Sequence, residues 1–136
     1  MSKTHEVLLP TGWPRPSGYS NGIAAEGRLL FVAGQVGWDP VSSAMVSPDF
    51  ARQTEAALDN ILAVLAAGTA RAEHVVRMTW FVTDLQAYRA ARAAIGQAFR
   101  RRFGGHYPAM SVVQVAGLLE AGALVEIEAT AVVPAQ

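Results

Sequence analysis

The hydrophobic pattern changes its period between residues 50 and 83, and this change constrains the fold more than any other feature of the chain. One stripe of side chains recurs at spacings of three and four, at Phe50, Thr54, Ala57, Ile61 and Leu65. This spacing predicts a helix with a single core-facing stripe. Ser47-Pro48-Asp49 offers a hydroxyl cap, a first-turn proline and an acidic side chain for its start, and Gly68 offers a left-handed end.

Residues 75–83 alternate instead, and one face of the alternation consists of Val76, Met78, Trp80 and Val82. Alternation predicts a strand, because successive side chains of a strand point to opposite faces. The other face carries Arg77, Thr79, Phe81 and Thr83. A helix followed at once by a strand indicates a domain of the α+β class.

Two elements are expected before the first helix. Residues 28–33 form a nearly continuous apolar run that ends at Gly34, which is typical of a strand buried on both faces. Residues 19–24 are expected to pair with this strand as a hairpin, because Glu26-Gly27 can form the tight turn between them.

The remaining elements complete the sheet. Asp84 is expected to cap a second helix that ends at Gly104-Gly105, and two further strands follow at about 110–116 and 123–133. The order ββ-α-β-α-ββ predicts one mixed sheet with two helices on one face. The opposite face of that sheet then needs a cover.

Length and composition predict one domain over residues 1–136, in which residues 1–17 form an N-terminal loop or arm. A hydrophobic content of 51% beside a charged content of 16% indicates that a partner subunit covers part of the apolar surface. No apolar run approaches the roughly 20 residues that span a bilayer, and the N-terminus lacks a signal-peptide pattern. We therefore expect a cytoplasmic protein that does not associate with membranes.

The charges exclude some functions. Eleven basic and 11 acidic side chains cancel, which disfavours a nucleic-acid partner. We assign the run Arg100-Arg101-Arg102 to dipole complementation and solubility at a helix end. The chain has no cysteine, and His5, His74 and His106 lack the spacing of metal ligands, so we expect neither a metal nor a cofactor.

Three features could carry chemistry, namely an acidic pair, a tyrosine and a glycine, and each has a second interpretation. Glu126 and Glu128 point to one face of the last strand, either as a solvated surface or with a carboxylate at a pocket that works as general acid or base on water. Tyr19 could bind a ligand or serve as an ordinary hairpin aromatic. Gly34 could present its backbone amide to a ligand or release the chain into a turn.

Several segments occur in a recognisable order. They are Gly18-Tyr19-Ser20, Phe31-Val32-Ala33-Gly34-Gln35-Val36, Phe50 with Gln53, Ala57-Leu58-Asp59-Asn60-Ile61 with Val64-Leu65, Val75-Val76-Arg77-Met78-Thr79, Tyr107-Pro108-Ala109 and Val125-Glu126-Ile127-Glu128-Ala129. In this order they resemble the RidA (YjgF/YER057c-like) family, from Gly18 to almost the last residue.

The resemblance implies a chorismate mutase-like homotrimer. In this arrangement the uncovered sheet faces pack around a central three-fold axis in a barrel-like manner, the helices lie outside, and a ligand cleft lies at each subunit interface. In deaminating members an arginine directly after the Pro-Ala pair clamps the substrate carboxylate, and water hydrolyses an enamine or imine to a keto acid and ammonia. A guanidinium suits this task through its bidentate fork.

This chain departs from the family pattern at the clamp. Met110 occupies the arginine position and offers only an adaptable apolar surface. Ala33 replaces a hydroxyl residue, and Arg92 stands where the family often has asparagine. Arg92, or Arg15 from the loop, could supply a cation from another direction, and Trp38 could form a wall of the pocket.

Four residues still match cleft positions of the family, namely Tyr19, Gly34, Ala109 and Glu126. The first hypothesis is therefore an enamine or imine deaminase, in which Glu126 and Tyr19 act on the reacting group and Met110 shapes specificity. The alternative is a trimer that binds or senses a small ligand without turnover. An endoribonuclease or translation inhibitor is disfavoured, because the neutral chain lacks a basic stripe with interleaved aromatic residues.

Overall fold

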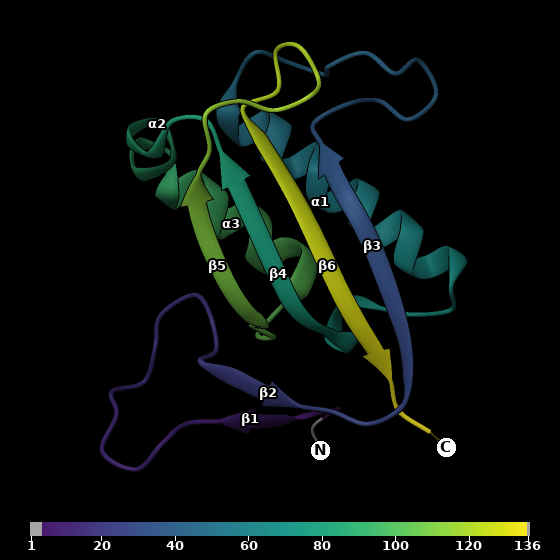
Figure 1. Ribbon diagram of the computed structural model, residues 1–136, viewed down its shortest axis with the longest axis vertical. Helices are drawn as coiled ribbons and strands as arrows, with labels where there is room; N and C mark the ends of the chain where they lie inside the picture. Colours follow the sequence, from purple (N-terminus) through teal and green to yellow (C-terminus); the bar gives the residue numbers. More distant parts are fainter. Residues whose placement is uncertain (1–3, 136) are drawn as a thin grey trace.

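The computed structural model describes residues 4–135 and contains a four-stranded sheet in the order β3-β6-β4-β5 (Figure 1). The strands are β3 (Arg28–Val36), β4 (Val75–Val82), β5 (Ala109–Gln114) and β6 (Val125–Val133). β6 runs antiparallel to β3 and β4, whereas β4 and β5 are parallel. The predicted mixed sheet is therefore confirmed.

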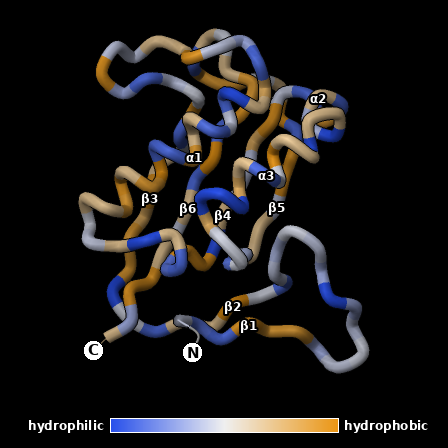
Figure 2. Tube along the Cα trace, turned by 180° about the vertical axis from the view of Figure 1, so that it is seen from behind, coloured by the Kyte–Doolittle hydropathy of each residue, from blue (hydrophilic) through white to orange (hydrophobic). Residues whose placement is uncertain are grey.

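The helices cover one face of this sheet, as Figures 1 and 2 show from opposite sides. They are α1 (Phe50–Ala67), the short 3₁₀ helix η1 (Ala72–His74), α2 (Leu85–Ala90) and α3 (Arg92–Phe103). The predicted second helix is thus two helices. They are separated at Ala91, whose backbone angles of −96° and 7° interrupt the helical geometry.

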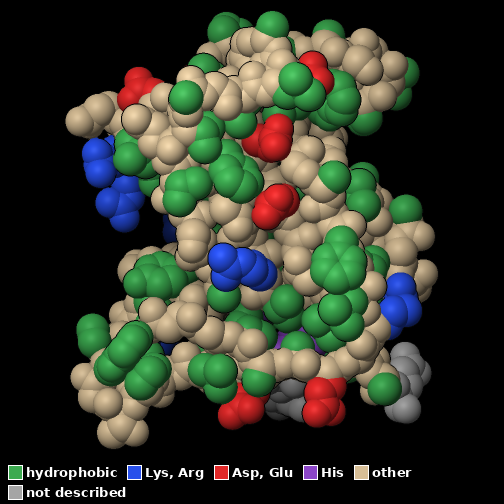
Figure 3. All heavy atoms as spheres, in the orientation of Figure 1, with side chains coloured by type: hydrophobic (Ala, Val, Ile, Leu, Met, Phe, Trp, Pro, Cys, Tyr) green, Lys and Arg blue, Asp and Glu red, His purple; other side chains and the backbone are tan. Residues whose placement is uncertain are grey.

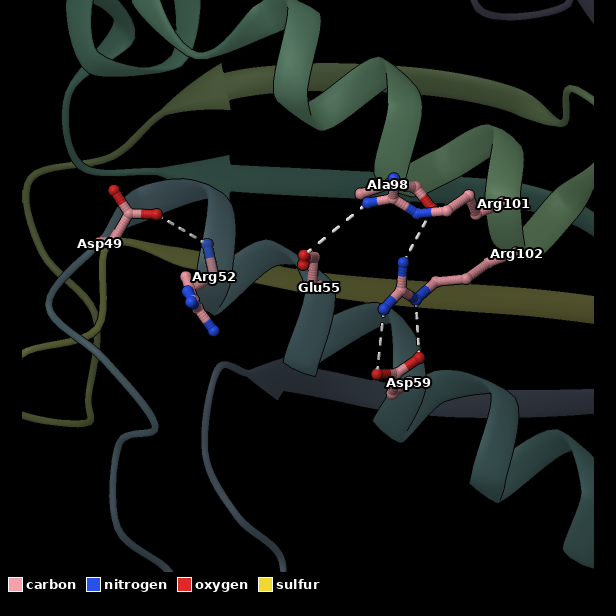
Figure 4. Close-up of polar contacts among 7 residues, drawn as sticks. All are labelled: Asp49, Arg52, Glu55, Asp59, Ala98, Arg101 and Arg102. Carbon is pink, nitrogen blue, oxygen red and sulfur yellow. Dashed lines mark hydrogen bonds and ion pairs between the residues drawn. The ribbon is translucent and has the colours of Figure 1, made fainter.

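The start of α1 differs from the prediction by two residues. Asp49 is the capping residue, and its carboxylate accepts a hydrogen bond from the Arg52 backbone N–H at 3.1 Å (Figure 4). The Ser47 hydroxyl instead accepts from the Asp49 N–H at 3.0 Å, so it orders the turn before the helix. The positive end of the helix dipole also stabilises a carboxylate in the cap position.

The core fills the space between the helices and the sheet. Its fully buried side chains come from three elements, and the largest are Leu58, Ile61, Leu65, Met78 and Ile127. Each such side chain stabilises the fold by about 1.5–3 kcal/mol relative to exposure. The predicted α1 stripe therefore meets the sheet as expected.

The alternation of β4 is confirmed for Met78, Trp80 and Val82, which are buried. A register irregularity between Val75 and Arg77 shifts the pattern at the start of the strand. As a result Val75 is buried there, whereas the predicted Val76 is only half-buried.

The N-terminal segment contains a strand as well as a loop. β1 (Glu6–Leu8) pairs antiparallel with β2 (Gly22–Ala24) in a separate two-stranded sheet, so the predicted hairpin between residues 19–24 and 28–33 is wrong. The cause lies at Gly27, which has a φ of 147° and packs against the backbone of Val133. This packing turns β3 onto β6 instead of onto β2. Residues 1–3 of the predicted arm lie outside the described residues.

Within residues 4–135, no helix covers the second face of the four-stranded sheet (Figure 1). Figure 3 shows this face, where hydrophobic side chains surround a few acidic and basic ones. Leu29 and Phe31 are 55% and 75% exposed. Glu126 and Glu128 lie on this face, because Val125, Ile127 and Ala129 of the same strand are buried in the core. The prediction of an uncovered face is confirmed.

Candidate functional site

A cleft of about 470 Å³ opens on the helix side, between α3, β5 and the chain that leads to β2. Its aromatic lining consists of Tyr19, Trp80, Tyr88, Phe99 and Tyr107. This volume lies within the usual range of small-molecule sites, which are mostly apolar with a few polar groups. The cleft is therefore our candidate site.

Three of the predicted site residues meet in this cleft, namely Tyr19, Arg92 and Met110. Met110 faces the helices because it stands opposite Met78 in the parallel pairing of β4 and β5, and Met78 is fully buried in the core between the helices and the sheet. Arg92 is the first residue of α3 and is exposed. The cleft thus receives a cation, Arg92, from α3, whereas β5 contributes the thioether of Met110.

Tyr19 is positioned by its neighbour Ser20. The Ser20 backbone N–H donates to the Pro108 carbonyl at 3.0 Å, and the Ser20 hydroxyl donates to the Tyr107 carbonyl. These bonds hold the N-terminal segment alongside the start of β5, next to Ala109. Tyr19 itself is 42% exposed, so its phenol is free to meet a ligand.

Glu126 and Gly34 lie together elsewhere, on the uncovered face of the sheet. The pairing of β3 with β6 shifts register between Val32 and Gln35, and Glu126 lies over Gly34 at this irregularity. A Cβ at position 34 would come within 2.8 Å of Glu126 Cγ, so this approach requires a glycine. Neither residue lines the cleft of the same chain.

Three other predicted residues also lie outside the cleft lining. Ala109 begins β5 and pairs with Arg77. Trp38 follows β3, where its carbonyl accepts a hydrogen bond from Asn60 Nδ2 at 3.0 Å. Arg15 lines a separate groove of about 930 Å³ beneath the N-terminal segment.

The three consecutive arginines of α3 have different surroundings, which corrects their assignment to dipole and solubility alone. Arg102 donates two hydrogen bonds to the Asp59 carboxylate of α1, at 2.6 and 3.1 Å, and Arg101 lies 3.9 Å from Glu55 (Figure 4). The hydrogen bonds to Asp59 raise the pKa of Arg102 above its usual value. Arg100, in contrast, lines the cleft.

Trp80, like Arg100, lines the cleft although the sequence did not predict it as a site residue. The alternating pattern placed it only on one face of a strand. It is 3% exposed and contacts Tyr88 and Phe99. Among the described residues, its indole Nε1 is the only buried side-chain nitrogen or oxygen without a hydrogen-bond partner. A buried donor without an acceptor typically costs about 1–3 kcal/mol.

The three histidines are all engaged with the backbone. His5 Nε2 lies 2.9 Å from the Val132 carbonyl, and His106 Nε2 lies 2.7 Å from the Val75 carbonyl. His74 Nδ1 accepts from the Arg71 backbone N–H at 2.9 Å. Within residues 4–135, no three histidine or acidic side chains gather as a metal site would require. No helix in this part of the chain is both long enough and apolar enough to cross a membrane.

Comparison with known proteins gives one family. The model of the family described as Endoribonuclease L-PSP matches residues 14–133. Protein DfrA of Myxococcus xanthus is 39% identical over 115 residues, which cover 84% of each chain. The human 2-iminobutanoate/2-iminopropanoate deaminase is 30% identical over 114 residues, covering 84% of this chain and 79% of the human protein.

A solved structure agrees with this assignment. YyfB from Yersinia pestis, described as a protein of unknown function of the conserved Rid protein family, superposes with a TM-score of 0.84 at 32% identity. The match covers 96% of this chain and 99% of YyfB. The chain therefore belongs to the Endoribonuclease L-PSP family, which is the RidA/YjgF family that its motifs resemble.

Proposed function

We propose that the protein hydrolyses a reactive enamine or imine metabolite, releasing ammonia, with a specificity altered by Met110. The observation that carries this proposal is the meeting of Tyr19, Met110 and Arg92 in one cleft of ligand size. Relatives support it, because some are named 2-iminobutanoate/2-iminopropanoate deaminases.

The active assembly is a homotrimer in this proposal. Leu29 and Phe31 leave an apolar surface on the uncovered face, and such surfaces are typical of subunit interfaces. Glu126 lies on that face and does not line the cleft of its own chain. Packing of three copies by these faces would bring Glu126 of one copy toward the cleft of the next, so each site would draw on two subunits.

The chemistry needs a base and a polarising donor. The Glu126 carboxylate takes a proton from water, and the resulting hydroxide equivalent adds to the carbon of the C=N bond. The nitrogen takes up that proton from Glu126, the hydroxyl proton of the tetrahedral intermediate then passes through Glu126 to the nitrogen as the C–N bond breaks, and a ketone and ammonia leave. The Tyr19 hydroxyl hydrogen-bonds the reacting nitrogen or oxygen. An enamine first gains a proton on carbon and loses one from nitrogen to become the imine.

Met110 changes which substrates bind. A thioether offers no charge-assisted hydrogen bond to a carboxylate, whereas an arginine at this position would. Loss of such a contact typically costs about 2–5 kcal/mol of binding free energy when it is partly buried. Small 2-imino acids held only from the strand side are therefore expected to be poor substrates.

The same observation favours a second candidate, a trimer that binds a small metabolite without turnover. Such a protein keeps the aromatic cleft for affinity and does not need Glu126. Thermal-shift measurements separate the two candidates, because a binder is stabilised increasingly as the ligand concentration rises and leaves the ligand unchanged.

The decisive experiment compares Glu126→Gln with Glu128→Gln. Both side chains lie on the same face of β6, so Glu128→Gln is a matched control for charge and for assembly. Ammonia release is measured from freshly generated imines, and the oligomeric state of each variant is measured by light scattering. We expect Glu126→Gln to lose about a hundredfold or more of the rate, and Glu128→Gln to retain it. Equal rates in both variants would remove Glu126 from the mechanism, and no acceleration by the wild type would leave the binding trimer.

A further inference from the structure

The α3 wall of the cleft carries two arginines on one helix. Arg92 and Arg100 both line the cleft and lie roughly two helical turns apart. Gly96 lies midway between them, and the Arg100 side chain lies along it. A Cβ at position 96 would be 3.3 Å from Arg100 Nη1. The absence of a side chain at Gly96 thus makes room for the guanidinium against the wall.

Neither cation is neutralised within the described chain. The three ion pairs among residues 4–135 involve Arg71, Arg101 and Arg102. None of the residues that line the cleft is acidic. Two guanidiniums in a cleft without a carboxylate create a local potential that favours anions.

Trp80 adds an independent indication of a ligand. Its side chain belongs to the cleft lining and is almost fully buried, and its Nε1 has no acceptor among the described residues. Buried donors are rarely left unpaired in folded proteins. A ligand oxygen that reached this nitrogen would supply the missing acceptor.

We propose that the cleft selects dicarboxylate substrates, in which Arg92 and Arg100 each hold one acidic group and Trp80 contributes a further donor. One carboxylate fills the bidentate fork of a single guanidinium, so the second arginine is matched by a second carboxylate. This inference rests on the proposed function for the imine or enamine centre between the two acids. It places the anion-binding groups on α3, because β5 contributes Met110 to the cleft, which cannot bind an anion.

The test uses two stable keto acids, which correspond to the ketone products of the proposed hydrolysis. 2-Oxoglutarate and 2-oxopentanoate have the same chain length, and the second carries a methyl group in place of the second carboxylate. Calorimetric titration of the purified wild-type protein is performed at constant ionic strength, because salt screens exposed charges. We expect 2-oxoglutarate to bind about tenfold more tightly, as a second charge-assisted contact would provide.

Two variants locate the effect. Arg100→Gln removes a cleft cation, whereas Arg101→Gln removes the adjacent cation that faces Glu55 of α1. We expect Arg100→Gln to abolish most of the roughly tenfold preference, and Arg101→Gln to preserve it. In a Trp13→Phe, Trp38→Phe background, the emission of Trp80 should respond to 2-oxoglutarate, because neither other tryptophan lines the cleft.

The outcomes are distinguishable from a failure of the proposed function. Equal affinity of the wild type for the two acids, including no binding of either, overturns the dicarboxylate assignment. An equal loss in Arg100→Gln and Arg101→Gln also overturns it, since the effect would then be one of overall charge. Selective binding of 2-oxoglutarate together with no ammonia release from any imine would instead overturn only the enzymatic proposal.

Discussion

The carboxylate side chain of Glu126 lies over the α carbon of Gly34, across the pair formed by β6 and β3. Their closeness depends on a register irregularity in β3, and it leaves no room for a side chain at position 34. The glycine of the Gly34-Gln35 motif therefore has a local structural reason. It allows the candidate catalytic carboxylate to lie flat on the sheet.

Gly34→Ala is expected to displace the Glu126 side chain while leaving the fold intact. The new Cβ would meet the side chain of Glu126 rather than backbone, and Gly34 does not need a positive φ. We expect a loss of more than about tenfold in kcat, as for a misplaced general base, with a stability change below about 1 kcal/mol. Ammonia release and thermal unfolding measure the two effects. A large fall in melting temperature with an unchanged rate would contradict this account.

Met110→Arg is expected to restore a strand-side clamp for small substrates. The long side chain can keep its head at the cleft while its stem packs where Met110 packs now. We expect turnover of small 2-imino acids to rise by about tenfold or more through a lower KM, because a charge-assisted contact is gained. Met110→Leu is the control for packing and should show no such gain. A rise in both variants would argue that shape alone limits the wild type.

Gln53→Leu is expected to destabilise the protein. Gln53 is fully buried, donates to the carbonyls of Ser47 and Gly122 at 2.9 and 3.0 Å, and accepts from the Leu124 N–H at 2.8 Å. The substitution leaves these backbone groups without partners, at a cost of about 2–4 kcal/mol. Denaturant unfolding measures the loss. The exposed Gln86→Leu on α2 serves as the control, with a change near zero.

His74 makes stability depend on pH. Burial is the main cause that lowers its pKa below the usual value of 6.5, and it outweighs the opposing effect of Glu73. The other nearby groups, Arg71, His5 and His106, also lower this pKa. A lowered histidine pKa means that the unfolded chain binds the proton more tightly.

The contribution of His74 is therefore present above its usual pKa and is lost as the pH falls from about 6.5 toward the lower folded value. Urea unfolding between pH 7.5 and 5 should show decreasing stability for the wild type. His74→Asn can keep an acceptor for the Arg71 N–H but does not titrate, so its profile should be flatter over this interval. Parallel profiles for the two proteins would assign the pH dependence to other groups.

The hydrophobic pattern of the sequence predicted where helices and strands form better than it predicted which strands pair. The stripe of α1 and the buried face of β4 follow from spacing alone, because each reports which side of an element meets the core. The turn chemistry of Glu26-Gly27 predicts that residues 19–24 pair with β3 as a hairpin. The actual partner of residues 22–24 is β1, and that choice depends on the packing of Gly27 against Val133, which lies near the other end of the sequence.

The residues of the candidate site likewise include some that the sequence predicted and one that it did not. Tyr19, Met110 and Arg92 were predicted from motif positions, and the structure brings them into one cleft. Arg100 was missed because it is identical in sequence to its neighbours Arg101 and Arg102. Arg101 and Arg102 differ from Arg100 because they face Glu55 and Asp59 of α1. The four-residue spacing of these two acids on α1 would have indicated which arginines are paired and which one is not.

The attachment of Ser20 to the backbone of Tyr107 and Pro108 has a consequence for how this protein can diversify. Because the anchor lies directly after Tyr19, the loop that precedes it can gain, lose or exchange residues without moving the tyrosine. Different residues then control access to the cleft and the position of the Tyr19 phenol, so substitutions can change one without changing the other. Libraries that vary Ser17, which lines the cleft, together with the loop before it should thus change which molecules enter while leaving the reacting geometry as it is.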